Sequence, residues 1–221
     1  MLPRVLEPEV MDTADDARDY DAMDFVAVNT AFAEAALAVA PDEGLVLDLG
    51  TGTARIPLLM VARRPTLHVV GIDLSESMLV IARQHLAAAG PYACVEVRRL
   101  DAKATGFPDG CFDMVISNSI VHHLPEPLAV FRELARVASP WAALFLRDLL
   151  RPATEAEHAH LVATYCANDN PHQRQLFSDS LRAALTLDEV RALAEQAGLA
   201  DFTLARTSDR HWTLSRSHKW D

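Results

Sequence analysis

The sequence predicts an α/β protein with a Rossmann-like, mostly parallel sheet and helices on both faces. Short aliphatic runs alternate with helical patterns between residues 44 and 197, which is typical of strands joined by right-handed helical connections. The first run, residues 44–49, is apolar almost throughout, as expected for a strand buried on both faces. It ends in the turn Gly50-Thr51-Gly52, and glycine turns after a strand occur in many doubly wound proteins.

The elements follow in order along the chain. We predict strands at 44–49, 67–73, 93–100, 112–118, 141–146, 202–205 and 211–214, and intervening helices at 56–63, 76–89, 125–138 and 187–197. Ser75 and Thr186 are candidate N-caps, Thr186 within a capping box with Glu189, and Gly90-Pro91 is a helix stop. The short link 207–210 predicts a hairpin, so the last strand is antiparallel.

Length and composition predict one domain over residues 1–221. Residues 1–40, with an Ala-rich helix at 25–40, form an N-terminal helical cap, and the polar, His-rich stretch 152–185 forms a helical insertion over the site. No apolar run approaches the roughly 20 residues of a membrane span, and the acidic N-terminus does not resemble a secretory signal. A cytoplasmic protein is therefore expected.

The net charge of −11 disfavours nucleic acid as a partner, because binding phosphates requires clustered Lys and Arg. A small molecule is the expected partner, and the sequence gives no prediction of oligomeric state. The three cysteines form no CxxC pair, and His158, His160 and His172 lack the i, i+4 spacing of a helical metal pair. We therefore predict reduced thiols and no metal.

Polar residues follow the ends of successive predicted strands, where ligands bind in open α/β sheets. Asp73 lies about 20 residues beyond the glycine turn, at the distance of an acid that binds ribose hydroxyls. Asp101 ends the next strand and could accept from a purine amino group. Together these features predict an adenosyl site. Arg55 stands where a dinucleotide motif requires its third glycine, which weakens an NAD-binding interpretation.

At these points the sequence resembles the class I S-adenosylmethionine-dependent methyltransferases, particularly the group similar to ubiquinone and menaquinone biosynthesis methyltransferases. The four stretches that carry the resemblance are Asp48-Leu49-Gly50-Thr51-Gly52-Thr53-Ala54, Gly71-Ile72-Asp73-Leu74-Ser75 with Met78, Leu100-Asp101-Ala102, and Phe112 to Asn118 followed by Val121-His122-His123-Leu124. Ala54 replaces the last glycine of the first motif, and Trp141-Ala142 stands where the family commonly has Gly-Gly in a turn before the fifth strand.

The resemblance implies the strand order 3-2-1-4-5-7-6, S-adenosylmethionine as cofactor and S-adenosylhomocysteine as product. It implies that Asp73 binds the ribose, Asp101 the adenine amino group and the Ala102 amide a ring nitrogen. The full set of cofactor-binding candidates is Asp48, Gly50, Thr51, Gly52, Asp73, Leu74, Met78, Asp101, Ala102, Asn118 and Ser119.

The expected reaction is methyl transfer to a small molecule by in-line displacement, in which the protein aligns the reactants and excludes water. His122 and His123 are the catalytic candidates, because a hydroxyl or amine acceptor must lose a proton. The substrate candidates are Tyr20, His123, Arg147, Asp148, Tyr165 and Arg210. Arg147, Asp148 and Arg210 are expected in one cluster at the sheet edge, serving either substrate recognition or a structural salt bridge.

Three alternative functions remain open from the sequence. One is an adenosyl-binding protein without methyltransferase activity, and the less favoured two are an NAD-dependent oxidoreductase and an RNA methyltransferase.

Overall fold

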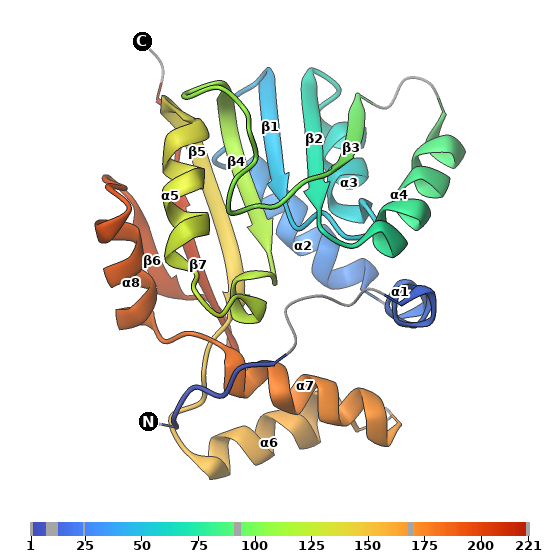
Figure 1. The fold of residues 1–221 in the computed structure, drawn as a ribbon, viewed down its shortest axis with the longest axis vertical. Coiled ribbons are helices and arrows are strands. Elements are labelled where there is room, and N and C mark those ends of the chain that lie inside the picture. Colours follow the sequence, from blue (N-terminus) through green and yellow to red (C-terminus); the bar gives the residue numbers. More distant parts are fainter. Residues whose placement is uncertain (1, 8–12, 24, 91–93, 168–169, 220–221) are drawn as a thin grey trace.

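The computed structural model describes residues 2–7, 13–23, 25–90, 94–167 and 170–219. A seven-stranded sheet in the order β3-β2-β1-β4-β5-β7-β6 forms its centre (Figure 1). Strands β1 to β5 are parallel, and β7 pairs antiparallel with both β5 and β6. The predicted fold class, strand order and antiparallel last strand are therefore confirmed. The strands are β1 Gly44–Leu49, β2 Leu67–Asp73, β3 Val95–Arg99, β4 Phe112–Asn118, β5 Ala138–Leu149, β6 Thr203–Arg206 and β7 His211–Arg216.

Helices cover both faces of the sheet. The central strands are largely apolar, so successive side chains present apolar groups to both faces. Leu47 and Leu49 of β1 pack in a core with α5 (Leu128–Val137) and α8 (Leu187–Gln196). Val46, on the opposite face, packs in a second core with α2 (Val26–Leu37) and α3 (Arg55–Arg63). Helix α4 (Glu76–Ala89) lies at the β3 end of the sheet (Figure 1). The predicted N-caps of α4 and α8 are both present.

A layer of helices lies beyond the carboxyl ends of the parallel strands, below the sheet in Figure 1. It contains α6 (Glu155–Tyr165) and α7 (Pro171–Ala183) from the predicted insertion, with α1 (Ala14–Ala22) to one side. Residues 2–7 run between the sheet and α7 (Figure 1), where the Val5 amide donates to the Arg182 carbonyl at 3.1 Å. None of the helices in the described residues is long and apolar enough to cross a membrane.

The structure departs from the predicted elements in two places. Helix α1 was not predicted, since its nine residues include four acids and show no sustained apolar period.

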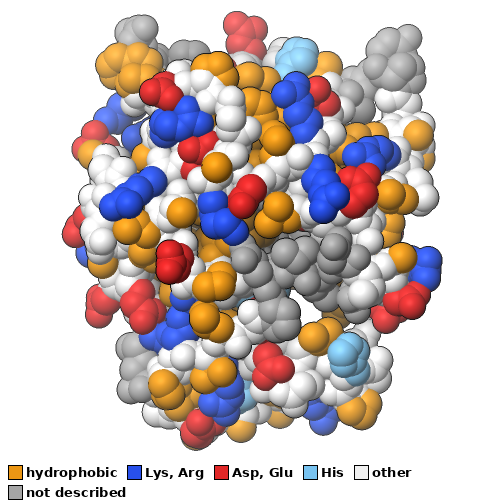
Figure 2. All heavy atoms as spheres, in the orientation of Figure 1, with side chains coloured by type: hydrophobic (Ala, Val, Ile, Leu, Met, Phe, Trp, Pro, Cys, Tyr) orange, Lys and Arg blue, Asp and Glu red, His pale blue; other side chains and the backbone are white. Residues whose placement is uncertain are grey.

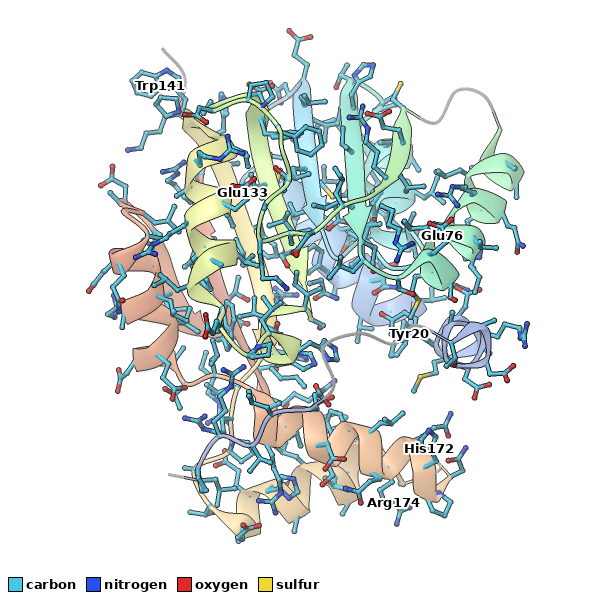
Figure 3. The ribbon with its side chains drawn as sticks, viewed as in Figure 1. Tyr20, Glu76, Glu133, Trp141, His172 and Arg174 are labelled. Carbon is cyan, nitrogen blue, oxygen red and sulfur yellow. The ribbon has the colours of Figure 1, made fainter. Side chains whose placement is uncertain are left out.

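Strand β5 begins at Ala138 instead of residue 141, and its pairing with β4 shifts register between Phe112 and Met114. This irregularity accommodates Pro140, which cannot donate to a regular ladder. Trp141 therefore lies within β5 instead of in a turn, at the end of the strand remote from the α6–α7 layer (Figure 3). Pro91 and Ala93, assigned to a helix stop and a strand start, lie outside the described residues.

Glu133 on α5 fastens the loop that follows β3. Its Oε1 accepts from the Thr105 amide at 2.7 Å and the Thr105 hydroxyl at 2.5 Å. Arg136 donates to both carboxylate oxygens, at 2.9 and 2.7 Å. The hydrogen bonds from Arg136, followed by those from Thr105, outweigh burial and lower the pKa of Glu133 from 4.5 to about 2. The loop held in this way contains Asp101 and Ala102.

We expect Glu133→Gln to reduce the free energy of unfolding by about 1–2 kcal/mol at neutral pH, because charge-assisted hydrogen bonds are lost. A lowered carboxyl pKa contributes stability above pH 4.5, and that contribution disappears as the pH falls towards 2. The difference between wild type and variant should therefore shrink in acid. Denaturant unfolding at pH 7 and pH 3 measures it, with the exposed Glu126→Gln as control. An equal difference at both pH values would contradict this assignment.

Candidate functional site

A cleft opens at the carboxyl edge of the sheet, where the ends of β1, β2 and β4 meet. It encloses about 820 Å³, counted to its open mouth, and Figure 2 shows the molecular surface hollowed between the sheet and the helical layer below. The lining residues are Tyr20, Gly50, Gly52, Ile72, Asp73, Leu74, Ser75, Met78, Leu100, Asp101, Ala102, Asn118, Ser119, Ile120, His123 and Leu124.

The two glycines of the first turn serve different purposes. A Cβ on Gly50 would lie 1.9 Å from Cγ2 of Ile120, so Gly50 allows close packing within the protein. A Cβ on Gly52 would meet no atom within 4 Å. Gly52 has a φ of +53°, a conformation that favours glycine. Because Gly52 lines the cleft, its missing side chain leaves space for a ligand to approach the backbone.

Ala54, which occupies the last glycine position of this motif, also adopts the left-handed conformation, with a φ of +60°. A non-glycine residue in this region costs on the order of 1–2 kcal/mol. Its methyl group is fully buried. Packing therefore accommodates the alanine without changing the turn.

Asp73 connects three elements around the cleft. Its Oδ2 accepts from the Gly52 amide at 2.9 Å, and its Oδ1 accepts from the Ser75 amide at the start of α4 at 2.9 Å. Burial raises the pKa of Asp73 although these backbone donors lower it. Each carboxylate oxygen can accept a further hydrogen bond, so the side chain that fixes the turn can also receive ligand hydroxyls.

The segments that follow β3 and β4 supply further predicted residues of the lining. Oδ1 of Asp101 accepts from the Lys103 amide at 2.8 Å, which orders the turn around Ala102. Ser119 follows β4 with a φ of +60°, a strained conformation for serine, and its amide donates to the Arg147 carbonyl at 2.9 Å. The structure places nine of the predicted cofactor-binding residues in the lining, leaving out Asp48 and Thr51.

Asp48 and Thr51 lie behind the turn. Asp48 is 2% exposed, and burial, together with the nearby charge of Asp73, raises its pKa from 3.8 to about 7. The Thr51 hydroxyl is buried without a hydrogen-bond partner. The Asp48 carboxyl is thus poised to gain or lose a proton near neutral pH, close to the cleft but outside its lining.

Tyr20 reaches the cleft from α1, on the side of that helix that faces the sheet (Figure 3). The adjacent Asp21 anchors α1, since its carboxylate accepts from Nε of Arg55 at 2.9 Å and lies 3.2 Å from Nε2 of His85. Arg55, the residue that breaks the dinucleotide motif, therefore holds the cap in place. This pair could not be predicted from sequence, because Asp21 and Arg55 are 34 positions apart in the chain.

A cluster of buried polar groups adjoins the cleft at the short helix η1 (Val121–His123). Nδ1 of His122 lies 2.5 Å from Oδ1 of Asp148, whose other oxygen accepts from the Val121 amide at 2.6 Å. Oε1 of Glu7 lies 3.1 Å from Nδ1 of His123 and 3.5 Å from Nε2 of His122. His123 lines the cleft, whereas His122 is buried behind it. Glu7 was not predicted as a site residue; its position depends on the course of residues 2–7.

The charges of this cluster offset the cost of burying it. Burial alone lowers the pKa of His122, but the charge and hydrogen bond of Asp148 outweigh burial and raise it. Burial raises the pKa of Asp148, and the charge of His122 reverses that shift. The close approach of His123, together with His122, likewise brings the pKa of Glu7 below its usual value despite burial.

The expected cluster of Arg147, Asp148 and Arg210 does not form. Arg147 and Asp148 are neighbours on β5, so their side chains point to opposite faces of the sheet. Asp148 meets His122, whereas the Arg147 guanidinium lies over the rings of Phe32 and Phe145.

Arg210 and Tyr165 pair with each other outside the lining of the cleft. The Arg210 guanidinium lies 3.4 Å from the centre of the Tyr165 ring, and the Tyr165 hydroxyl donates to Asp209 at 2.5 Å. These contacts fasten α6 to the β6–β7 turn. Of the predicted substrate residues, the structure brings Tyr20 and His123 to the cleft and places Arg147, Asp148, Tyr165 and Arg210 outside its lining.

Comparison with known proteins places these features in a family. Residues 46–141 match the model of a methyltransferase domain. The chain is 37% identical over 180 residues to the ubiquinone biosynthesis O-methyltransferase of Hahella chejuensis, covering 76% of this chain and 74% of that protein. It is 39% identical over 94 residues to a phosphatidylethanolamine N-methyltransferase of Cereibacter sphaeroides, covering 42% of this chain and 45% of that protein. In the second comparison the chain thus spans less than half of its relative.

A solved structure of a SAM-dependent methyltransferase from Aquifex aeolicus has the same fold, with a TM-score of 0.64. The two proteins share 22% identity, and the match covers 92% of this chain and 97% of the other. The match in fold therefore extends over most of the chain.

The raised pKa of Asp48 predicts a specific dependence of stability on pH. Between about pH 4 and pH 7 the folded protein retains a proton that the unfolded chain loses, so this group makes stability fall as the pH rises. Asp48→Asn removes that contribution. As the pH rises from 5 to 8, the free energy of unfolding of the variant should increase relative to that of wild type by on the order of 2 kcal/mol. Denaturant unfolding at the two pH values measures it, with the exposed Asp42→Asn as control. A pH-independent difference would show that Asp48 is ionised throughout.

Proposed function

Because the chain belongs to the class I S-adenosylmethionine-dependent methyltransferases, we propose that it transfers a methyl group from S-adenosylmethionine to a small-molecule acceptor. The observation that carries the proposal is the cradle formed by Gly52 and Asp73. The backbone at Gly52 faces open space in the cleft, and Asp73 is fixed beside it by the Gly52 and Ser75 amides.

The residues of the cleft fit the parts of the proposed cofactor. Asp73 would accept hydrogen bonds from the ribose hydroxyls, Asp101 from the adenine amino group, and the Ala102 amide would donate to a ring nitrogen. Apolar side chains of the lining, such as Leu74 and Met78, would cover the adenine ring. The cofactor supplies a methyl group on a positively charged sulfur, and the ionised form of buried Asp48 would be favoured by that charge.

The acceptor would bind at the end of the cleft formed by Asn118, Ser119 and His123. For an in-line displacement the protein aligns the acceptor atom with the methyl carbon and excludes competing water. Tyr20 on α1 and the layer of α6 and α7 surround this end of the sheet. His123 faces the cleft and is backed by Glu7, so the histidine pair would lie next to the point where a hydroxyl or amine acceptor must lose its proton.

A small acceptor suits the surface better than RNA. Over the described residues of the face in Figure 2, Lys and Arg side chains alternate with Asp and Glu instead of forming a basic patch. Nucleic-acid binding requires such a patch. The names of relatives, among them an O-methyltransferase of ubiquinone biosynthesis and a phosphatidylethanolamine N-methyltransferase, also support a small acceptor molecule.

Gly52→Ala tests the cofactor cradle. The added methyl group would project into the cleft, so we expect the dissociation constant for S-adenosylmethionine to rise at least about tenfold. The matched control is Gly198→Ala, because Gly198 also has a positive φ and open space but lies outside the lining. Both variants should lose on the order of 1 kcal/mol of stability from the strained backbone. Titration calorimetry measures binding, and equal affinities of the two variants would contradict the cradle.

The same protein can be assayed for transfer with methyl-labelled cofactor and a panel of phenols and amines. We expect S-adenosylhomocysteine and a labelled acceptor to form together, and NAD to produce no binding heat. Cofactor binding without labelled product across the panel would support the alternative of an adenosyl-binding protein without transfer activity.

A further inference from the structure

Three donor atoms from two distant parts of the chain converge beside the cleft. The side chains of Glu7, His122 and His123 each offer one ligand atom, and these atoms all lie within 4.8 Å of one another. We propose that the three residues bind a divalent transition-metal cation such as Zn²⁺. This differs from the prediction of no metal, which rested on the absence of a CxxC pair and on the spacing of the histidines in the insertion.

The spacing of the donor atoms suits a single cation. Oε1 of Glu7 is 3.1 Å from Nδ1 of His123 and 3.5 Å from Nε2 of His122. Ligands bound to zinc at about 2.0–2.1 Å in a tetrahedron lie about 3.3 Å apart. Side chains of the cluster therefore need little movement to enclose the ion.

Two of the three donor atoms lack hydrogen-bond partners. Oε1 of Glu7 and Nδ1 of His123 are both buried, and neither makes a hydrogen bond with acceptable geometry. Buried lone pairs without a partner are costly, on the order of 1–3 kcal/mol each. A cation placed between them would satisfy both atoms at once.

The groups behind the donors orient them as in known metal sites. Asp148 lies 2.5 Å from Nδ1 of His122, an arrangement that directs the other ring nitrogen, Nε2, towards the cluster. The Ser180 hydroxyl donates to Oε2 of Glu7 at 3.1 Å and leaves Oε1 for the ion. Such outer contacts fix ligand orientation and raise ligand basicity.

The local charge also favours a cation. Glu7 and Asp148 contribute two carboxylates, and Arg4 is the nearby fixed positive charge. The Arg4 guanidinium is directed to backbone carbonyls, those of Ala183 at 2.7 Å and Leu124 at 2.8 Å. Two imidazoles and one carboxylate suit zinc, iron, cobalt or nickel better than magnesium or calcium, which prefer oxygen ligands.

The position of the cluster suggests what the cation does. His123 lines the cleft, so an ion held by the three residues would lie beside the proposed acceptor end. If methyl transfer is the function, as proposed above, an acceptor oxygen bound to the ion would lose its proton more readily. This step rests on the proposed function, whereas cation binding does not.

Cation binding can be measured without cofactor or acceptor. After treatment with a chelator, the full-length protein is titrated with Zn²⁺ by calorimetry and with Co²⁺ by absorption spectroscopy. We expect one cation per chain and visible Co²⁺ bands of four- or five-coordinate geometry. Glu7→Gln and His123→Ala should each weaken binding at least about tenfold.

The matched control is His172→Ala, because His172 is exposed on α7 and remote from the cluster (Figure 3). It should bind Zn²⁺ as wild type does. Thermal unfolding without metal checks that each variant folds, and two independent variants keep the test valid if one does not. Absence of stoichiometric binding by wild type would overturn the proposal, as would equal affinity in wild type, Glu7→Gln and His123→Ala.

A titration with S-adenosylmethionine on the metal-free protein separates the two proposals. Cofactor binding without cation binding would overturn only the metal site. Cation binding that depends on Glu7 and His123, without cofactor binding, would support the metal site and contradict the proposed function.

Discussion

The carboxylate of Asp73 is the interaction on which the cleft depends. It accepts hydrogen bonds from the Gly52 amide after β1 and the Ser75 amide at the start of α4, and so holds three elements in one geometry. The same turn is fastened to β2 through the Ile72 carbonyl, which accepts from the Gly50 and Thr51 amides at 2.9 Å each. The backbone donors that point at this carboxylate offset part of the cost of burying its charge.

The opposite end of the cleft depends on contacts between segments far apart in the sequence. Residues 2–7 bring Glu7 against His122 and His123, and β5 brings Asp148 to the other side of His122. Arg4 and Val5 bind the end of α7, so the insertion holds the N-terminal segment in place. The insertion thus contributes to the site by positioning this segment; its predicted substrate residue Tyr165 instead anchors α6 to Asp209.

The fold and the Gly52–Asp73 end of the cleft were predictable because their signals are local. Aliphatic runs, caps such as Ser75, and polar residues at strand ends are visible in short windows of sequence, and the cleft contains nine of the residues predicted in this way. The contact between Glu7 and the histidines was not predictable, since Glu7 and His122 are 115 positions apart in the chain and only tertiary structure joins them. Arg147 and Asp148 show a second limit: both were placed correctly at the end of β5, but the alternation of the strand sends them to opposite faces.

A crystal structure with S-adenosylhomocysteine would test whether Asp73 and Gly52 form the cradle of the cofactor. We predict that the ribose hydroxyls of the ligand contact Asp73 and that its adenine lies beside Asp101 and Ala102. Its homocysteine part should pass over Gly52, with the sulfur directed towards Asn118 and His123. A ligand bound elsewhere, or one in the cleft whose ribose makes no contact with Asp73, would contradict the account.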